Sequence, residues 1–270
     1  MTREAVIVAA ALASASCGAS LLKLPAGPGV PASDAAAVLA AATAACGQVR
    51  TFSAEVAVSG KLHGRKMRGT LAVGFAAPAS ARIEAIAPFG APLFIFVATD
   101  DDGTLLLPRD DRYLAHAPPA TLLSAVAGVP FGPADLRAIV TGCGTTGRDV
   151  VGAQQIGSTW RRVQVSGGRN LYLHRDDRAW RLVAMVASRT EAARVEYAGF
   201  DGDVARSIHL VEYTGPGAPP SGYDLRLTLS QIEINIPLEA DVFRVQIPRS
   251  ADPMTLDELR RIGPVTSQSE

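Results

Sequence analysis

The sequence lacks an excess of charge of either sign, and it lacks an apolar run long enough to cross a membrane. Lys plus Arg and Asp plus Glu both number 26 among 270 residues, so the formal net charge is zero. Without a basic surface we expect no nucleic-acid partner. The apolar segment Ala5–Ala15 is far shorter than the ~20 residues that a transmembrane helix needs.

The sequence also lacks the motifs that usually indicate catalysis. Neither a Gly-x-Ser-x-Gly elbow nor a phosphate-binding loop is present. The four histidines are far apart and do not have the spacing of metal ligands; they are His63, His116, His174 and His209. We therefore expect a protein that is not an enzyme and that holds no metal and no cofactor.

The first seventeen residues have the layout of a bacterial lipoprotein signal. Arg3 precedes the apolar segment Ala5–Ala15, and small residues lead into Cys17. We predict that residues 1–16 are a signal peptide and that lipid is attached to Cys17 after cleavage. Since Ser14 stands where such signals usually carry leucine, an ordinary secretory signal cut at a nearby small residue is the alternative.

Cysteine is scarce, and its few positions are informative. If Cys17 carries lipid, Cys46 and Cys143 remain as an even pair in an oxidising compartment, which favours a disulfide between them. Such a bridge closes a long loop and contributes ~4–5 kcal/mol in the chain-entropy model. Two separate buried thiols are the alternative.

Composition divides the remaining chain into a tether, a domain and a tail. Residues 17–33 are rich in Pro, Gly and Ala and are predicted to be a flexible tether. The domain is expected over residues 34–248, and a polar tail over 249–270. The domain begins with an alanine-rich helix at Ala35–Ala45, whose outer face is poor in charge and is expected to lie against another surface.

Hydrophobic periodicity predicts a long antiparallel meander. Apolar residues alternate with others from Phe52 to Val58, as in a half-buried strand. Pro118–Ile139 interrupts the meander with two short helices, Thr121–Ala127 and Pro133–Val140. The other predicted strands are Leu71–Phe75, Ile83–Ala85, Leu93–Val97, Leu105–Leu107, Tyr113–Ala115, Trp160–Val165, Leu171–His174, Trp180–Ala187, Ala193–Phe200, Arg206–Tyr213 and Tyr223–Ile232.

The predicted fold class is mainly β: a curled antiparallel sheet or incomplete β-barrel of about eleven strands. A sheet of that size must curl or close. The N-terminal helix and the mid-chain helices then bury their apolar faces on the concave side. Two outcomes are open, a packed core or a lined cavity beneath a helical lid.

An apolar concave wall favours acyl chains as ligands, because each CH₂ removed from water contributes ~0.8 kcal/mol without directional contacts. Core packing is the alternative role for each wall residue. The predicted wall and lid residues are Phe52, Val56, Val58, Leu71, Val73, Phe75, Ile83, Leu93, Ile95, Val97, Leu122, Leu123, Val126, Leu136 and Ile139.

The loop Ala87–Pro92 contains an aromatic residue between prolines, Phe89, which has little core to enter. We therefore regard Phe89 as a candidate contact with a membrane or with cargo. The three acidic residues Asp100–Asp102 are interpreted as a hairpin turn, since the alternating spacing of a calcium loop is missing.

The order of these parts resembles the LolA/LolB lipoprotein-carrier superfamily, and most of all its LolB-like outer-membrane lipoproteins. The segments that carry the resemblance are Phe52–Gly60 with Gly69–Phe75, Pro88-Phe89-Gly90, Leu122–Phe131, Asp135–Gly142 and Ile234–Phe243.

The resemblance implies an incomplete β-barrel that is closed by helices and binds acyl chains. It further implies a lipid-anchored protein on the periplasmic face of the outer membrane, which receives or inserts lipoproteins, with a periplasmic LolA-like carrier as a possible donor. Phe89 matches the apolar residue of the Pro-Leu-Gly loop of LolB, which helps deliver cargo. A structural lipoprotein that scaffolds an envelope complex with the same fold is the alternative.

Overall fold

The computed structural model describes residues 21–144, 148–177, 179–187, 193–212 and 222–264. These residues form one sheet of fifteen strands, β1 (Val30–Pro31), β2 (Thr51–Leu62), β3 (Arg65–Ala76), β4 (Ser80–Ile86), β5 (Ile95–Thr99), β6 (Asp102–Leu107), β7 (Arg112–Ala117), β8 (Val150–Ile156), β9 (Trp160–Val165), β10 (Arg169–Arg175), β11 (Trp180–Val186), β12 (Ala193–Asp201), β13 (Val204–Glu212), β14 (Tyr223–Ile234) and β15 (Asp252–Pro253). The helices are α1 (Ala35–Ala42), η1 (Ala44–Gln48), α2 (Pro119–Ala127), α3 (Pro133–Thr141), η2 (Ala240–Phe243) and α4 (Leu256–Ile262).

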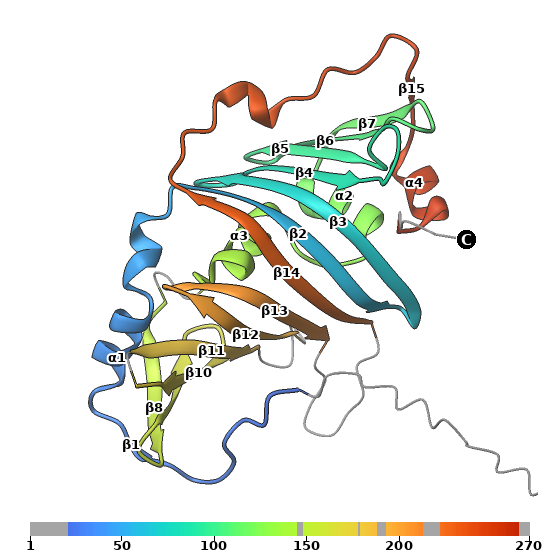
Figure 1. Ribbon diagram of the computed structural model, residues 1–270. Coiled ribbons are helices and arrows are strands. Elements are labelled where there is room, and N and C mark those ends of the chain that lie inside the picture. Colours follow the sequence, from blue (N-terminus) through green and yellow to red (C-terminus); the bar gives the residue numbers. More distant parts are fainter. Residues whose placement is uncertain (1–20, 145–147, 178, 188–192, 213–221, 265–270) are drawn as a thin grey trace, which may run out of the picture.

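The sheet is curled and unclosed, as predicted. Its order is β1-β8-β9-β10-β11-β12-β13-β14-β2-β3-β4-β5-β6-β7-β15. All neighbouring strands are antiparallel except β15, which runs parallel to β7. We call β2–β7 with β15 the first half-sheet and β8–β14 with β1 the second half-sheet. The two halves join where β14 pairs with β2, along nearly the whole of both strands (Figure 1).

Strand β2 shows why the sequence folds in this way. Phe52, Ala54, Val56 and Val58 are buried, and the residues between them are more exposed. The period of two therefore turns one continuous apolar face toward the concave side. That face joins the core of both half-sheets, with Phe75, Ile83 and Phe96 from the first half, and Leu171, Val195 and Ile208 from the second.

The helices lie on the concave side, where their apolar faces are buried. In Figure 1, α2 and α3 lie within the curve of the sheet; α2 contacts β6 and α4, while α3 contacts β4 and β13. Both helices begin with proline and end at a glycine with positive φ, Gly128 (69°) and Gly142 (72°). Such glycines end a helix without steric cost.

Helix α1 packs on the second half-sheet through Ala35, Val38 and Leu39. Its position is fixed by Asp34, which precedes the helix and accepts two hydrogen bonds from the buried Arg161 guanidinium, at 2.9 and 2.8 Å. The hydrogen bond from Arg161 lowers the pKa of Asp34. The outer face of α1 is exposed and consists of alanines, so the prediction that this face lies against another surface is not met within the described chain.

The predicted tether and tail both contribute to the folded domain. β1 pairs with β8, and the Leu22 N–H donates to the Glu196 carboxylate at 3.0 Å. At the other end, Met254 and Leu259 are buried, so residues 249–264 are not a polar tail. Helix α4 begins with a capping box in which Thr255 and Glu258 bond each other reciprocally. These hydrogen bonds from Thr255 lower the pKa of Glu258 to about 2.

Candidate functional site: the interior and its two ends

Strand β2 defines the two ends of the interior. At Leu62 it turns into β3, and we call this the hairpin end; at Thr51 it begins beside the disulfide, and we call this the disulfide end. At ~3.3 Å per residue, its twelve residues separate the ends by about 36 Å. The interior therefore has three parts that could hold a site: the stretch between the ends, and each of the two ends.

Between the ends, thirteen of the fifteen predicted wall residues belong to the core or pack against it. Eleven of the fifteen are buried, and Leu71, Leu93, Ile95 and Leu136 are partly buried. The helix side chains Leu122, Leu123 and Val126 are only 0%, 1% and 0% exposed. Since a side chain facing open space would be accessible, these three fill the interior in this conformation rather than line a cavity.

Strand β5 corrects two of the predicted wall residues. Ile83 pairs with Phe96, and both belong to the concave core. Ile95 and Val97 therefore point to the opposite, convex face, where η2 covers β4 and β5. Strand β5 is apolar on both faces because both faces are covered. Its sequence therefore lacks the alternation of apolar and polar residues that would have indicated which side chains face the core.

A wide hollow lies at the hairpin end. It is a cleft of about 700 Å³ between α2, α4, the β2–β3 turn and the start of β14, and we call it the mouth cleft. From α2 it is lined by small side chains only, Ala120, Thr121, Ser124 and Ala125, followed by Gly128. Its other lining residues include His63, Glu212, Tyr223 and Arg260. None of these residues was predicted as a site residue.

Tyr223 is the buried polar residue of the mouth cleft. Its ring is 4% exposed and meets the Phe131 ring edge-on, with 5.8 Å between the centroids. Its hydroxyl has no hydrogen-bond partner. Burial, and next the charge of Glu212, raise the pKa of Tyr223 to about 12. The hydroxyl is thus a neutral, unused hydrogen-bond donor.

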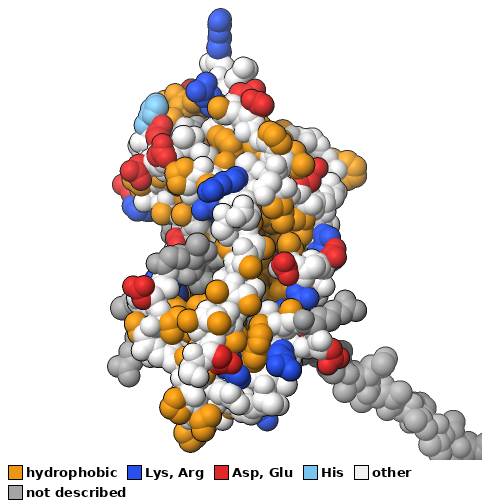
Figure 2. Space-filling view, turned by 90° about the vertical axis from the view of Figure 1, so that its left-hand side faces the viewer, with side chains coloured by type: hydrophobic (Ala, Val, Ile, Leu, Met, Phe, Trp, Pro, Cys, Tyr) orange, Lys and Arg blue, Asp and Glu red, His pale blue; other side chains and the backbone are white. Residues whose placement is uncertain are grey.

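The disulfide end has much less open space than the hairpin end. Its hollow is a fissure of about 60 Å³, lined by Phe52, Trp180, Tyr197 and Phe200 among others. Burial raises the pKa of Tyr197, whose hydroxyl also has no hydrogen-bond partner. In Figure 2, which shows this end of the molecule, hydrophobic and uncharged side chains occupy much of the centre of the face.

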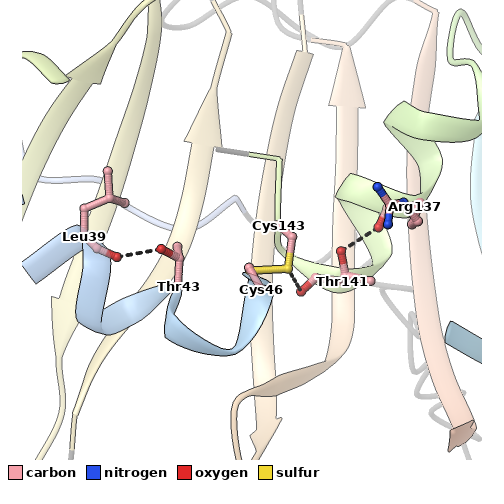
Figure 3. The surroundings of a disulfide bond; sticks show 6 residues. All are labelled: Leu39, Thr43, Cys46, Arg137, Thr141 and Cys143. Carbon is pink, nitrogen blue, oxygen red and sulfur yellow. Dashed lines mark hydrogen bonds between the residues drawn. A yellow bond between two sulfur atoms is a disulfide. The ribbon is translucent and has the colours of Figure 1, made fainter. Parts of the chain in front are cut away.

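The predicted disulfide between Cys46 and Cys143 is confirmed, with Cα atoms 5.4 Å apart. It joins Cys46 in η1 to Cys143, two residues after the end of α3 (Figure 3). Threonine hydroxyls bond the last turns of the two neighbouring helices. Thr43 donates to the Leu39 carbonyl of α1 (2.8 Å), and Thr141 donates to the Arg137 carbonyl of α3 (2.7 Å). The bridge therefore pins α3 to the chain that follows α1.

Phe89 stands on a braced loop at the hairpin side of the first half-sheet. β4 runs toward the hairpin end, and the loop leaves it at Ile86, which pairs with Thr70; Thr70 in turn pairs with Ala57, halfway along β2. The Phe89 side chain is 88% exposed. From the β6–β7 turn, Arg109 donates to the carbonyl oxygens of Phe89 (2.7 Å) and Ala91 (3.1 Å). The loop backbone is thus held in place while its aromatic side chain faces solvent.

A small third hollow lies beneath this loop. Its volume is about 50 Å³, and Val58, Leu71, Leu93 and the end of α2 at Ala127 line it. That volume is far below the ~300–1,000 Å³ of typical ligand pockets. In this conformation the hollow lined by Val58, Leu71 and Leu93 is therefore too small to hold an acyl chain.

On the convex face of the second half-sheet lies a buried polar network that sequence reasoning missed. Glu196 bonds Arg194 and the Leu22 N–H, and His209 lies within 3.6 Å of it and 2.7 Å of Asp224. Burial opposes ionisation of Glu196, but the bonds from His209, Leu22 and Arg194 outweigh it and lower its pKa. The network fixes the N-terminal segment and faces away from the interior.

The described residues contain no group of three or more His, Cys, Asp or Glu arranged to hold a metal ion. Among the same residues, no helix has both the length and the apolar character needed to cross a membrane. Cys17, the predicted lipid attachment residue, lies outside the described residues.

Comparisons with known proteins agree with the observed architecture. A LolA superfamily protein from Nitrosomonas europaea has a similar structure, with a TM-score of 0.52 and 12% identity over 76% of this chain and 98% of that chain. A putative outer membrane lipoprotein-sorting protein domain from Vibrio parahaemolyticus gives a TM-score of 0.47 and 13% identity, over 72% of this chain and 89% of that chain. No family model and no curated protein matches the sequence. The first likeness shows that the chain has a LolA-like fold.

Proposed function

We propose that this chain is a LolB-like, lipid-anchored protein of the outer membrane that binds acyl chains and receives or inserts lipoproteins. The LolA-like fold, the apolar concave face and the helices within the curve of the sheet support this proposal. Cys17 is the proposed site of lipid attachment, on the periplasmic face of the membrane. A periplasmic LolA-like carrier is the proposed donor of cargo.

The proposed mechanism has three steps and includes no chemical reaction. The lipid on Cys17 holds the domain at the membrane, α2 and α3 move away from the concave face, and acyl chains enter and then pass to the bilayer near Phe89. The transfer is driven by differences in burial, at ~0.8 kcal/mol for each CH₂ group. No cofactor or metal takes part.

The observation that carries the proposal is the exposed Phe89 on its braced loop. A large aromatic side chain that is 88% exposed does not stabilise the core. Arg109 nevertheless donates two hydrogen bonds that hold the loop carrying it. Such a rigid apolar projection suits insertion into the interface of a bilayer, where aromatic side chains are favoured.

Replacing Phe89 tests this role. We expect Phe89→Glu to reduce lipoprotein insertion into liposomes at least tenfold, because a charged group replaces the apolar contact. Phe89→Leu is the matched control, which keeps an apolar side chain and should retain insertion within about twofold. Both variants should have the thermal stability of the wild type. Unchanged insertion by the Glu variant would contradict the role of the loop.

A second candidate, a structural lipoprotein that scaffolds an envelope complex, is favoured by one observation. Leu122, Leu123 and Val126 fill the interior, as expected for a domain that takes no ligand. Native mass spectrometry of protein purified from membranes separates the candidates. Co-purification of a diacyl or triacyl species beyond the protein's own lipid supports the carrier, whereas empty protein supports the scaffold.

A further inference from the structure

Two buried tyrosines end in hydroxyl groups without a partner, and they lie at opposite ends of the interior. Tyr197 and Tyr223 are each 4% exposed. Among the described residues, only their hydroxyls and Arg112 Nε are buried side-chain polar atoms that make no hydrogen bond. An unpaired buried hydroxyl destabilises a fold, and natural structures keep few of them. A ligand that supplies the missing partner is one reason to keep such a group.

Only one of the two tyrosines has space beside it for a ligand. Tyr223 lines the mouth cleft of about 700 Å³, whereas Tyr197 lines the fissure of about 60 Å³. The mouth cleft has the size of typical small-molecule sites, and the small side chains of α2 keep it open. Tyr223 also adjoins the core, since it pairs with the buried Leu62 across β14 and β2.

The charges around the mouth cleft indicate the polarity of the ligand. Glu212 lines the cleft and raises the pKa of Tyr223 further than burial alone does, so a negative group beside the hydroxyl is disfavoured. Arg260, on the α4 side, is already paired with Asp257 at 3.3 Å. The best partner for the Tyr223 hydroxyl is therefore an uncharged hydrogen-bond acceptor of the ligand. The hydroxyl groups of Thr121 and Ser124 also line the cleft.

We propose that the mouth cleft binds the ester-linked glyceryl region of a diacyl amphiphile, with the Tyr223 hydroxyl donating a hydrogen bond to an ester carbonyl. The inference rests on the proposed function, because it places the polar end of the same ligand. The hydroxyl oxygen is buried beneath the lining of the cleft, so the ester reaches it when α2 moves, and the acyl chains then extend toward the core that α2 now fills.

A cycle with two ligands and two matched variants tests the hydrogen bond. The ligands are a fluorescent S-diacylglyceryl-cysteine peptide and its dialkyl ether analogue, which has no ester carbonyl. Tyr223→Phe removes only the unpaired hydroxyl, so the free protein should fold and be at least as stable as the wild type. We expect this variant to bind the diester about five- to tenfold more weakly, as for one lost hydrogen bond, and to bind the diether unchanged. Tyr197→Phe should leave both affinities unchanged.

The possible outcomes distinguish this inference from the proposed function. If the wild type binds both amphiphiles and Tyr223→Phe has no selective effect on the diester, the headgroup site is overturned while acyl binding stands. Equal losses in Tyr223→Phe and Tyr197→Phe also overturn it, because they indicate a general effect on folding. If the wild type binds neither amphiphile, the proposed function fails and this inference fails with it.

Discussion

The two ends of the interior differ in how firmly they are held. At the disulfide end, Cys46–Cys143 ties η1 to the chain after α3, and the remaining fissure is only about 60 Å³. At the hairpin end, α2 meets α4 across the mouth cleft of about 700 Å³, through small side chains. One end is therefore covalently cross-linked, and the other is held by non-covalent contacts, among them the Arg112–Glu258 ion pair of α4, around an open cleft.

This difference indicates where the interior opens. If acyl chains enter, the helix that must move farthest is α2, because Leu122, Leu123 and Val126 occupy the space. Helix α3 is restrained by the disulfide just after its C-terminal end, whereas α2 contains no cysteine. The Phe89 loop and the mouth cleft also lie toward the hairpin end. We therefore expect the disulfide end to supply stability and the hairpin end to supply function.

The largest predicted effect tests the disulfide end. Replacing both cysteines, Cys46→Ser with Cys143→Ser, should lower the free energy of unfolding by ~4–5 kcal/mol, because the unfolded chain loses a long closed loop. Chemical denaturation measures this change, and reduced wild-type protein is the control. Binding of the diester amphiphile should stay within about twofold. A loss of binding at temperatures where the variant remains folded would contradict the division of roles.

The next effect concerns the helix that fills the interior. Leu123→Ala on α2 should lower the free energy of unfolding by ~3 kcal/mol, because it leaves a cavity in the core. The same cavity should strengthen binding of the diester amphiphile severalfold. Leu136→Ala on α3 is the control, since Leu136 is only partly buried; it should cost less stability and leave binding unchanged. Weaker binding by Leu123→Ala would contradict the displacement of α2.

A smaller effect on stability is expected at the Phe89 loop. Arg109→Ala removes two hydrogen bonds to exposed backbone and should lower the free energy of unfolding by about 1 kcal/mol. Lipoprotein insertion should nevertheless fall severalfold, because the loop no longer holds Phe89 in place. Arg65→Ala, on the β2–β3 hairpin, is the control for a general loss of positive charge. Equal losses in both variants would show that charge, and not the brace, matters.

The smallest predicted effect is a pH dependence in the alkaline range. The unfolded chain releases a tyrosine proton near pH 10, whereas folded Tyr223 retains it until about pH 12. Since the folded pKa is raised, the associated stability is present below pH 10 and is lost as pH rises toward 12. Compared with the wild type, Tyr223→Phe should therefore show a shallower fall in stability between pH 10 and 12. Urea denaturation at several pH values measures the difference, and identical slopes would contradict it.

The sequence was sufficient where local signals and packing agreed. The alternation from Phe52 to Val58 predicted β2 and its buried face, and proline and glycine predicted the limits of α2 and α3 to within a few residues. The disulfide followed from the parity of the cysteines. Helix α4 was missed although Thr255 and Glu258 form a readable capping box. The polar residues around that short helix concealed it.

Other features required the assembled sheet. Ile95 and Val97 were assigned to the wrong face because β5 is apolar on both sides. The site residues of the mouth cleft come from α2, α4, the β2–β3 turn and β14, segments whose proximity no local pattern indicates. The missing partner of the Tyr223 hydroxyl is likewise a property of packing. Sequence therefore predicted the shell of the interior and not the mouth cleft.

The most direct test is to find where an acyl chain contacts the protein. A diacylglyceryl lipid with a photoactivatable diazirine near the middle of one chain is bound to the oxidised protein, irradiated, and the adducts are located by peptide mass spectrometry. We expect adducts on α2 and on the first residues of β14, at the hairpin end. Adducts confined to the fissure around Trp180 and Phe200, or no adducts above those of an unrelated protein, would contradict this expectation.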